Sequence, residues 1–234
     1  MEQHSSGPGT ISHTLEEQTE ANNERLLSLT DPLGNNTLVY LKAHALRSKE
    51  IIRDYRLGSA RFRGLDCLAI PYLAPDGRVL QIRYRCVEGT VEDGRLVEHD
   101  HKEHVERGGK YLTVGGSNSR LYNTSAYLAA GEVIGLAEGE PDSIAATAYI
   151  GIPTMGYAGS TQWKAHGHFW EVALRDFQRV VIFADGDAVG VECARGVAED
   201  LGKRASIVRC DNDMDVASMV AAGKENTLIK RLPS

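Results

Sequence analysis

The sequence predicts an α/β protein in which a parallel sheet flanked by helices follows a smaller, basic α+β subdomain. Two patterns support this. From residue 132 onward, short apolar runs alternate with helical stretches, as in parallel sheets that are covered by helices. Upstream, residues 67–73 and 79–87 are two β-rich runs joined by the turn APDG, as in an antiparallel hairpin.

The distribution of charge is a third observation. Lys and Arg against Asp and Glu give residues 1–37 a net charge of −5, residues 38–128 +4, and residues 129–234 −5, which together make the total of −6. A basic middle beside an acidic end suits a protein that holds a polyanion on one part and a metal ion on another. Ordinary variation between surface patches remains the alternative on charge alone.

Composition excludes several classes of protein. Apolar content of 42% and charged content of 25% are typical of soluble proteins, and no run of about eighteen apolar residues is present to span a membrane. The polar amino terminus lacks the apolar stretch of a secretory signal, so a cytoplasmic location is expected. The four cysteines lack the spacing of a zinc ribbon, and we expect free thiols and no zinc: Cys67, Cys86, Cys193 and Cys210.

Three segments follow in chain order. Residues 1–36 are acidic and polar, predicted as flexible or partly helical, with a short helix starting at Ser12 or Thr14. Residues 37–130 form the basic subdomain, which begins with two short helices that end at Gly58. The hairpin follows, then a ragged hairpin or loop over 88–109 and a strand over 110–114.

Residues 131–234 form the predicted α/β catalytic domain. Apolar runs predict strands at residues 133–137, 152–159, 179–184 and 204–210. Helical stretches lie between and after them, over 141–149, 161–177, 188–202 and 215–223.

Acidic side chains follow three of these strands. Glu138 ends the first, Asp185 and Asp187 follow the third, and the segment DNDMD follows the last. Because the carboxyl ends of parallel strands meet at one edge, these groups should lie together, as oxygen ligands for Mg²⁺ or Mn²⁺. Taken singly, each has a simpler explanation: Asp-Gly-Asp is a common turn, and Glu138 suits a helix start.

The motifs at these strand ends resemble a known family. EGEPDSIAA, GIPTMGYAG and VVIFADGDAVGVECARGVAEDLG resemble the Toprim domain shared by DnaG-type primases, topoisomerases, OLD-type nucleases and RecR-like proteins, over about residues 131–228. EGExD with DGDxxG is most similar to primases of bacteria and their phages. LAIPYLAPDGRVLQIRYR and KYLTVGGSNSRLYNTSAYL resemble the segments before Toprim in those primases, which extends the resemblance to about residues 38–228.

The resemblance implies a Toprim-like fold and a DNA primase of the bacteriophage kind, reduced to a catalytic core. It implies metal-dependent synthesis of short primers on single-stranded DNA from nucleoside triphosphates. Catalytic roles fall on Glu138, Asp185 and Asp187, whereas Glu140 matches a variable or indirectly supporting position. Matching the motifs by position gives the metal ligands as Glu138, Asp142, Asp185, Asp187 and Asp213 or Asp215, and the phosphate-binding residues as Arg83, Arg85, Lys110 and Arg120.

Two parts of a full replicative primase are missing from the sequence. It contains neither an amino-terminal Cys/His zinc module nor a G-x-x-x-x-G-K-[ST] loop. A separate helicase or zinc-module protein is therefore an expected partner, and the location is the host cytoplasm if a phage encodes the chain. The alternatives are a Toprim nuclease and a non-catalytic module that binds nucleic acid or a replication partner.

Two aromatic or imidazole clusters have simpler explanations than ligand binding. His99, His101 and His104 lie close enough in sequence for a transition metal, but their spacing fits no standard zinc site, and a solvated loop is the preferred interpretation. Trp163, Phe169 and Trp170 are expected to pack in the core rather than stack on bases.

Overall fold

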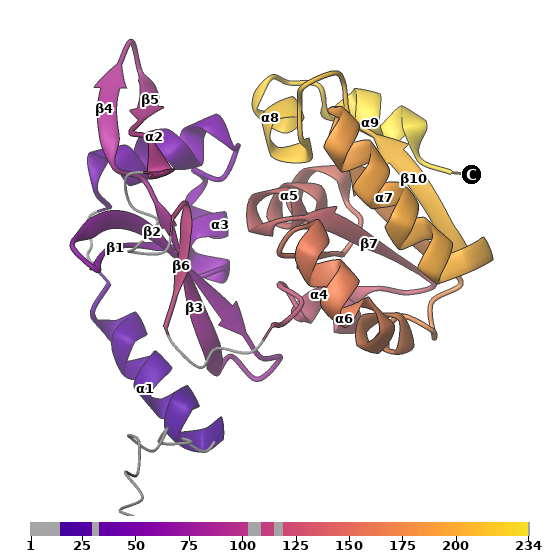
Figure 1. Ribbon diagram of the computed structural model, residues 1–234, viewed down its shortest axis with the longest axis horizontal. Helices are drawn as coiled ribbons and strands as arrows, with labels where there is room; N and C mark the ends of the chain where they lie inside the picture. Colours follow the sequence, from indigo (N-terminus) through magenta and orange to yellow (C-terminus); the bar gives the residue numbers. More distant parts are fainter. Residues whose placement is uncertain (1–14, 30–32, 103–108, 115–118, 234) are drawn as a thin grey trace, which may run out of the picture.

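The computed structural model describes residues 15–29, 33–102, 109–114 and 119–233 (Figure 1). The predicted helix starts Ser12 and Thr14, and the histidine His104, lie outside these residues. The described chain contains two sheets of four strands and one separate two-stranded hairpin. Its fold class is therefore the α/β class that the sequence predicts.

The first sheet is antiparallel, in the order β1-β2-β3-β6. The turn between residues 73 and 79 lies where APDG predicts it, and Gly77 has the positive φ of +85° that favours glycine. The first strand, β1, was not predicted. The helices expected up to Gly58 end at Asp54, and Gly58 begins β1. The strands are β1 (Gly58–Phe62), β2 (Leu65–Leu73), β3 (Val79–Cys86) and β6 (Tyr111–Thr113).

Three helices pack around this sheet: α1 (Leu15–Leu27), α2 (Asn35–Ala43) and α3 (Lys49–Asp54). Two asparagines fix α1 along β3. The Asn22 side chain donates to the Leu80 carbonyl over 2.8 Å, and Asn23 accepts from the Val79 amide over 3.1 Å. The described helix α1 therefore packs against the start of β3.

A hairpin of β4 (Gly89–Glu92) and β5 (Arg95–Glu98) projects beyond the sheet (Figure 1). Asp93 and Gly94 both have positive φ, +48° and +73°, which is the type I′ turn that suits two-residue hairpins. The ragged hairpin expected over residues 88–109 thus contains one regular hairpin.

The second sheet is parallel, in the order β10-β9-β7-β8, and agrees with the predicted α/β pattern. Its strands are β7 (Val133–Glu138), β8 (Thr154–Tyr157), β9 (Arg179–Ala184) and β10 (Ala205–Arg209). Between β6 and β7 lies α4 (Ser125–Ala129), and after β7 come α5 (Glu140–Ala145) and the π-helical turn η2 (Ala146–Ile150).

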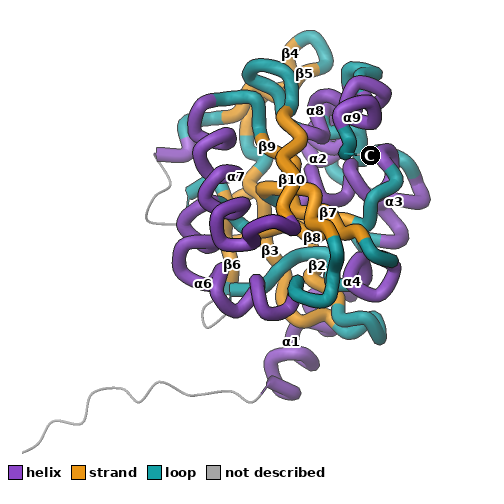
Figure 2. Tube along the Cα trace, turned by 90° about the vertical axis from the view of Figure 1, so that its right-hand side faces the viewer, coloured by secondary structure: helices purple, strands orange, loops and turns teal. Residues whose placement is uncertain are grey.

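Helices cover both faces of the parallel sheet (Figure 2). Val180 and Ile182 of β9 pack in the core formed with α6 (Ser160–Ala173) and α7 (Ala188–Leu201). Their neighbours Val181 and Phe183 pack on the opposite face. That face is covered by α5, α8 (Val216–Ala221) and α9 (Glu225–Arg231), while a short 3-10 turn, η3 (Gly202–Arg204), leads into β10. The sequence analysis did not foresee α4 or α9.

The aromatic residues of α6 divide by helix face. Trp163 and Trp170 are buried in the core as expected, with ring centroids 5.7 Å apart. Phe169 is 65% exposed, so its expected burial was wrong. Positions 163 and 170 are seven apart and share one helix face, which position 169 leaves by about 100°.

Several contacts join the two sheets. Tyr122, between them in the chain, forms a bridge to Gly156 of β8. Thr124 donates to the Leu73 carbonyl over 2.8 Å, and the Tyr149 hydroxyl donates to the Ala45 carbonyl over 2.9 Å. Among the helices that the structure describes, none combines the length and apolarity needed to cross a membrane.

Candidate functional site

The carboxyl edge of the parallel sheet gathers acidic side chains from three strand ends. Glu138 is the last residue of β7, and Asp185 follows β9 directly. Asp187 is the N-cap of α7 and accepts from the Gly190 amide over 2.6 Å. Asp215 is the N-cap of α8, with a capping box to Ser218. Helix caps thus fix two of the carboxylates.

These carboxylates repel one another. The pKa of Asp185 is raised to about 7, first by burial and then by the charges of Asp215, Glu138 and Asp187. Burial also raises the pKa of Asp142 well above its usual range, with Asp215, Asp185 and Glu138 adding to it, although the Ala217 amide donates to its carboxylate over 2.8 Å. The edge therefore carries concentrated negative charge that a cation would stabilise.

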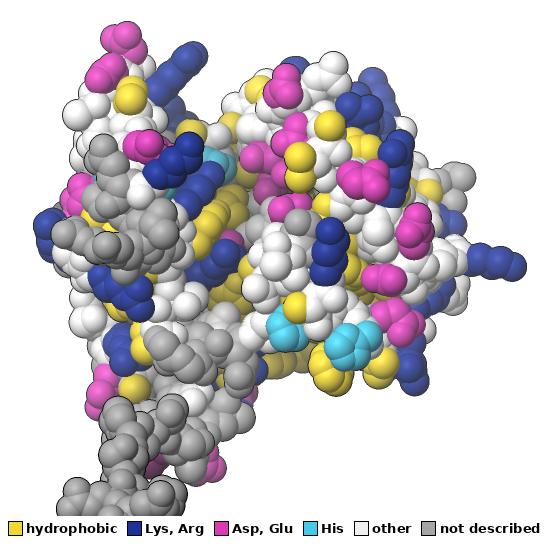
Figure 3. Space-filling model, in the orientation of Figure 1, with side chains coloured by type: hydrophobic (Ala, Val, Ile, Leu, Met, Phe, Trp, Pro, Cys, Tyr) yellow, Lys and Arg dark blue, Asp and Glu magenta, His cyan; other side chains and the backbone are white. Residues whose placement is uncertain are grey.

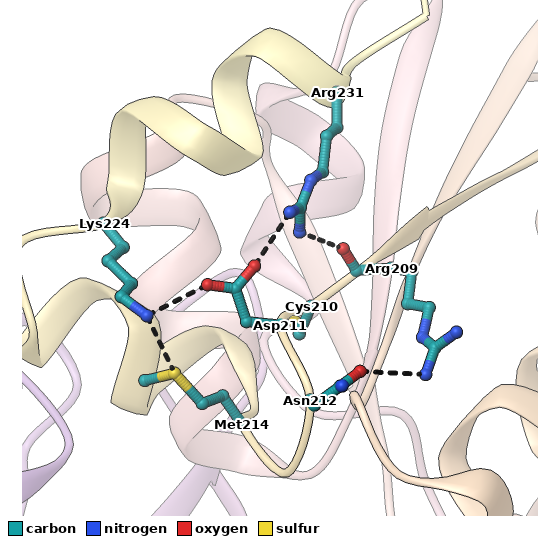
Figure 4. Close-up of a pocket in the computed structure, with 7 residues that line it drawn as sticks. All are labelled: Arg209, Cys210, Asp211, Asn212, Met214, Lys224 and Arg231. Atoms are coloured by element: carbon teal, nitrogen blue, oxygen red, sulfur yellow. Dashed lines mark hydrogen bonds and ion pairs between the residues drawn. The ribbon is translucent and has the colours of Figure 1, made fainter.

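The segment DNDMD contributes one member to this group. Asp215 is the residue whose charge acts on both Asp185 and Asp142. Asp213 lies in the preceding turn with a left-handed φ of +57°. Asp211 turns away, toward a hollow at the end of β10 that Figure 4 shows. There it accepts from Lys224 over 3.0 Å and from Arg231 over 2.8 Å.

The donor set at the sheet edge fits a hard divalent cation. All its ligands are carboxylate oxygens, which Mg²⁺ and Mn²⁺ prefer. Within the described residues, no three of these oxygens all lie within 4.8 Å of one another. Mg²⁺ is usually held by one or two carboxylates together with water and substrate phosphates rather than by an all-protein cage, so this wide spacing suits a site completed by a nucleotide.

Two glycines give the acidic loops their close approach. A Cβ at Gly186 would lie 1.7 Å from the Asp211 carbonyl oxygen, and a Cβ at Gly190 would lie 2.5 Å from the Asp185 Cβ. The Gly186 amide also donates to the Met214 carbonyl over 2.8 Å. Gly186 therefore allows the loop after β9 to pack directly against the loop after β10, and Gly190 allows the start of α7 to pack against Asp185.

The basic strand β3 faces this edge. Arg83 donates to Glu140 over 2.6 Å, and the Tyr72 hydroxyl donates to the same Glu140 oxygen over 2.5 Å. The Arg83 guanidinium lies over the Tyr111 ring, 4.1 Å from its centroid. The Glu140 side chain is 1% exposed and the Arg83 side chain 17% exposed. Glu140 is therefore a buried link between the antiparallel sheet and α5.

Arg85 lies two residues after Arg83 on β3, and it is buried. Its guanidinium pairs with Glu98 over 2.5 Å, donates to the Cys86 carbonyl, and lies 5.0 Å from the centroid of the Tyr40 ring. Both arginines expected to bind phosphate thus form ion pairs within the chain, and the direct role of either in phosphate binding stays a prediction.

The other two predicted basic residues differ in their surroundings. Lys110 is exposed and lies next to β6. The pKa of its amine is lowered, first by partial desolvation and then by the charge of Arg85. The charges of Glu98 and Asp215 act in the opposite direction. Arg120 is half-buried, and its Nε is buried without a hydrogen-bond partner. Figure 3 shows the resulting hollow, with Lys and Arg side chains on one wall and Asp and Glu side chains on the wall facing it.

The contacts of Glu140 with Tyr72 and Arg83, which join these walls, were not predicted from the sequence. Glu140 and Tyr72 were not expected to meet, because they lie 68 positions apart and on different sheets. The strand that contains Arg83 indicated such a contact. Most of its other residues are apolar enough to be buried, and a buried guanidinium requires a carboxylate partner. Glu140, the middle acid of EGEPD, was the acid without an assigned role.

The fold is similar to that of several solved structures. No protein-family model matches the sequence. The structure of a DnaG catalytic core superposes with a TM-score of 0.65 at 20% identity, over 93% of this chain and 79% of that one. The RNA polymerase domain of Mycobacterium tuberculosis primase DnaG, in complex with a DNA oligomer, gives 0.66 at 15% identity, over 92% and 79%. The primase fragment of the bacteriophage T7 primase-helicase gives 0.59 at 16% identity, over 79% and 70%.

One relative is much closer in sequence. The Gene 57 protein of Mycobacterium phage D29 is 37% identical over 175 residues, which are 73% of this chain and 99% of the phage protein. The alignment spans nearly the whole relative, so the likeness is not limited to one motif. The chain belongs to the family of that phage protein, and its fold is that of the DnaG-type primase catalytic core.

Proposed function

We propose that the chain is a DNA primase-type nucleotidyltransferase that synthesises short primers on single-stranded DNA during phage replication. One observation carries the proposal: carboxylates from three strand ends face a basic strand across one hollow, on the scaffold of a primase catalytic core. Acidic groups alone would suit any metal enzyme. The opposed basic wall adds a surface for a nucleic-acid backbone.

Glu138, Asp185 and Asp187 would hold Mg²⁺ or Mn²⁺, with Asp142 and Asp215 adding negative charge around it. The ion, when bound, neutralises triphosphate charge and favours attack by a primer 3′-hydroxyl. Capping bonds fix the proposed ligand Asp187 at the start of α7 and the neighbouring charge of Asp215 at the start of α8. Asp142 is anchored by the Ala217 amide of α8.

The basic wall would position phosphates. Lys110 is exposed and close enough to Asp215 for their charges to interact, so it lies where a nucleotide would bridge the two walls. Arg83 acts through its pairing with Glu140, which sets the distance between β3 and the acidic edge. The buried Nε of Arg120, which lacks a hydrogen-bond partner, is a donor that a bound phosphate would satisfy.

The proposed partners are single-stranded DNA and nucleoside triphosphates, in the cytoplasm of a bacterial host. A DnaG catalytic domain has been described bound to single-stranded DNA, and T7 primase domains bound to an RNA/DNA hybrid. A separate helicase or zinc-module protein would supply unwinding and the choice of start site.

The test is a synthesis assay on single-stranded DNA with labelled ribonucleotides or deoxynucleotides and Mg²⁺ or Mn²⁺. Wild type should give metal-dependent oligonucleotides, and Glu138→Gln and Asp185→Asn should abolish them. Asp215→Asn and Asp213→Asn form a matched pair, because asparagine keeps the α8 cap. We expect the first to reduce synthesis at least tenfold and the second to leave it within about twofold.

Other outcomes would overturn the proposal. Shortened template DNA without new products would indicate a nuclease. Tight binding of DNA with neither product would indicate a non-catalytic binding module. Full synthesis by Asp185→Asn would show that the metal is held elsewhere.

A further inference from the structure

A second cluster of potential metal ligands lies at the base of the β4–β5 hairpin, in the basic part of the chain. Cys86 is the last residue of β3, and His99 and His101 follow β5. The Cys86 Sγ lies 3.8 Å from the His99 Nε2, and the two imidazole centroids are 4.9 Å apart. Among the residues that the structure describes, this is the one group of three such side chains whose ligand atoms all lie within 4.8 Å of one another.

The orientation of His101 favours a metal ligand. Its Nε2 lies 2.8 Å from the Glu98 carboxylate, while its Nδ1 is buried without a hydrogen-bond partner. Glu98 is fixed in turn by Arg85, over 2.5 Å. Metal-binding histidines commonly donate their second ring nitrogen to a carboxylate, which leaves the other nitrogen for the ion. Glu98 and Arg85 would therefore orient the imidazole, and the Nδ1 lone pair has a use only if a ligand is bound.

We propose that Cys86, His99 and His101 form a Zn²⁺ site that is separate from the acidic edge. A thiolate and two imidazoles are the softer ligands that zinc prefers, whereas the carboxylates of the sheet edge suit Mg²⁺. Three protein ligands leave a fourth position of the zinc tetrahedron for water. This proposal replaces the expectation that zinc is absent, and it does not depend on the proposed primase activity.

The spacing of these three residues in the sequence does not match that of a standard zinc motif. Cys86 and His99 are 13 positions apart, far beyond the short spacing of zinc knuckles. The intervening hairpin folds back on itself, because Glu92 pairs with Arg95 and Gly89 with Glu98, and so brings its two ends together. A bound ion would thus close the base of the hairpin. Metal would stabilise the end of β3 that carries Arg85.

The experiment is a metal analysis of the purified chain, free of any affinity tag that binds metal. After incubation with Zn²⁺ and removal of the excess, wild type should retain one equivalent per chain, and Cys86→Ser and His101→Ala should retain less than a fifth of it. Two matched controls should keep the ion: Cys67→Ser, whose cysteine is buried directly opposite Cys86 on β2, and His168→Ala, on the exposed face of α6.

Substitution by Co²⁺ provides a direct signature. Wild type should show a thiolate-to-cobalt charge-transfer band that disappears in Cys86→Ser and remains in Cys67→Ser and in Asp185→Asn. Retention in Asp185→Asn separates this site from the acidic edge. In buffer without Mg²⁺ or Mn²⁺, chelation should lower the thermal stability of zinc-loaded wild type, whereas the near-isosteric variant Cys86→Ser, treated in the same way, should show no such loss.

Three results would overturn the proposal. The first is wild type that holds no zinc after exposure to one equivalent, and the second is Cys86→Ser that keeps both the ion and the charge-transfer band. Loss of the ion in Asp185→Asn but not in His101→Ala would place it at the acidic edge instead.

Discussion

Arg83 and Glu140 form a nearly buried ion pair that joins the antiparallel sheet to the parallel sheet, with 2.6 Å between guanidinium and carboxylate. Tyr72 donates to the same carboxylate oxygen, and Tyr111 lies under the guanidinium. Glu140 is the first residue of α5, which begins just after Glu138. The pair therefore fixes the basic strand β3 relative to Glu138.

Removing one member of this pair should be costly. Arg83→Met leaves the Glu140 charge buried without its partner, and we expect the free energy of unfolding to fall by about 3–5 kcal/mol. Denaturant titration measures this. Replacing both residues, as in Arg83→Met with Glu140→Leu, should recover part of the loss.

Exposed pairs supply the control for this prediction. Arg61 and Asp66 are 3.0 Å apart, with side chains 68% and 54% exposed. Arg61→Met should cost less than about 1 kcal/mol. Equal losses at the two sites would contradict the assignment of Glu140 as a buried link.

Relief of repulsion at the acidic edge should stabilise the chain when no metal is bound. Burial and the charges of Asp215, Glu138 and Asp187 raise the pKa of Asp185. Asp185→Asn removes one charge from this group. In chelator at pH 8, we expect the variant to be about 1 kcal/mol more stable than wild type while losing synthesis. Glu192→Gln, an exposed change on α7, should stay within about 0.5 kcal/mol. A destabilised Asp185→Asn would show that the carboxylates do not repel.

Two glycines of α7 should respond in opposite directions to alanine. A Cβ at Gly190 would meet the Asp185 Cβ at 2.5 Å, whereas a Cβ at Gly196 meets nothing within 4 Å. Gly190→Ala should therefore displace Asp185 and lower both stability and synthesis. Gly196→Ala should raise the free energy of unfolding by about 0.5–1 kcal/mol through helix propensity alone. Thermal unfolding and the synthesis assay together test the contrast.

Lys110 should contribute to DNA affinity through phosphate charge. Lys110→Ala should weaken binding of single-stranded DNA equally for all sequences and reduce the slope of log affinity against log salt by about 0.7 for one phosphate contact. Lys164→Ala, on exposed α6, serves as the matched control and should leave the slope unchanged. An unchanged slope in both variants would exclude Lys110 from the interface.

His44 should make stability depend on pH below neutrality. Burial lowers its pKa, Arg85 and Lys110 add to this effect, and the Tyr40 carbonyl and Asp215 oppose it. The unfolded chain therefore takes up a proton near pH 6.5 before the folded chain does, so stability is full above that pH and falls as the pH drops further. In chelator, His44→Gln should lose less thermal stability than wild type between pH 7 and pH 5. Parallel losses would refute the assignment.

The sequence predicted the parallel part of the fold well because each strand is a short apolar run between helical stretches. The strand predicted over residues 179–184 is β9 with the same bounds. Periodicity could not reveal β1, because its alternation consists of only Ala60 and Phe62 beyond a glycine that marks the expected helix end. It could not reveal α9, because ENTLIKR lies beyond Gly223, which indicates the end of a helix.

The acidic residues of the candidate site were found for a similar reason, since strand ends are visible in the sequence. The sequence could not show which aspartate of DNDMD interacts with Asp185. Asp215 does so, whereas Asp211 is held in ion pairs by Lys224 and Arg231. The pairing of Arg83 with Glu140 also depends on tertiary packing, which brings α5 against β2 and β3. The division of the chain at residues 36 and 130 stays a prediction.

The separation of opposite charges between the two sheets makes the molecule an electric dipole. Residues 38–128, which contain the antiparallel sheet, carry +4, which the acidic helix α1 packed on that sheet partly offsets, and residues 129–234, which contain the parallel sheet, carry −5. A diffusing strand of DNA would exert a torque on such a dipole before any contact, turning the basic wall toward the strand and the acidic edge away from it. The encounter would therefore be oriented in advance, and raising the salt concentration should slow association more than it speeds dissociation.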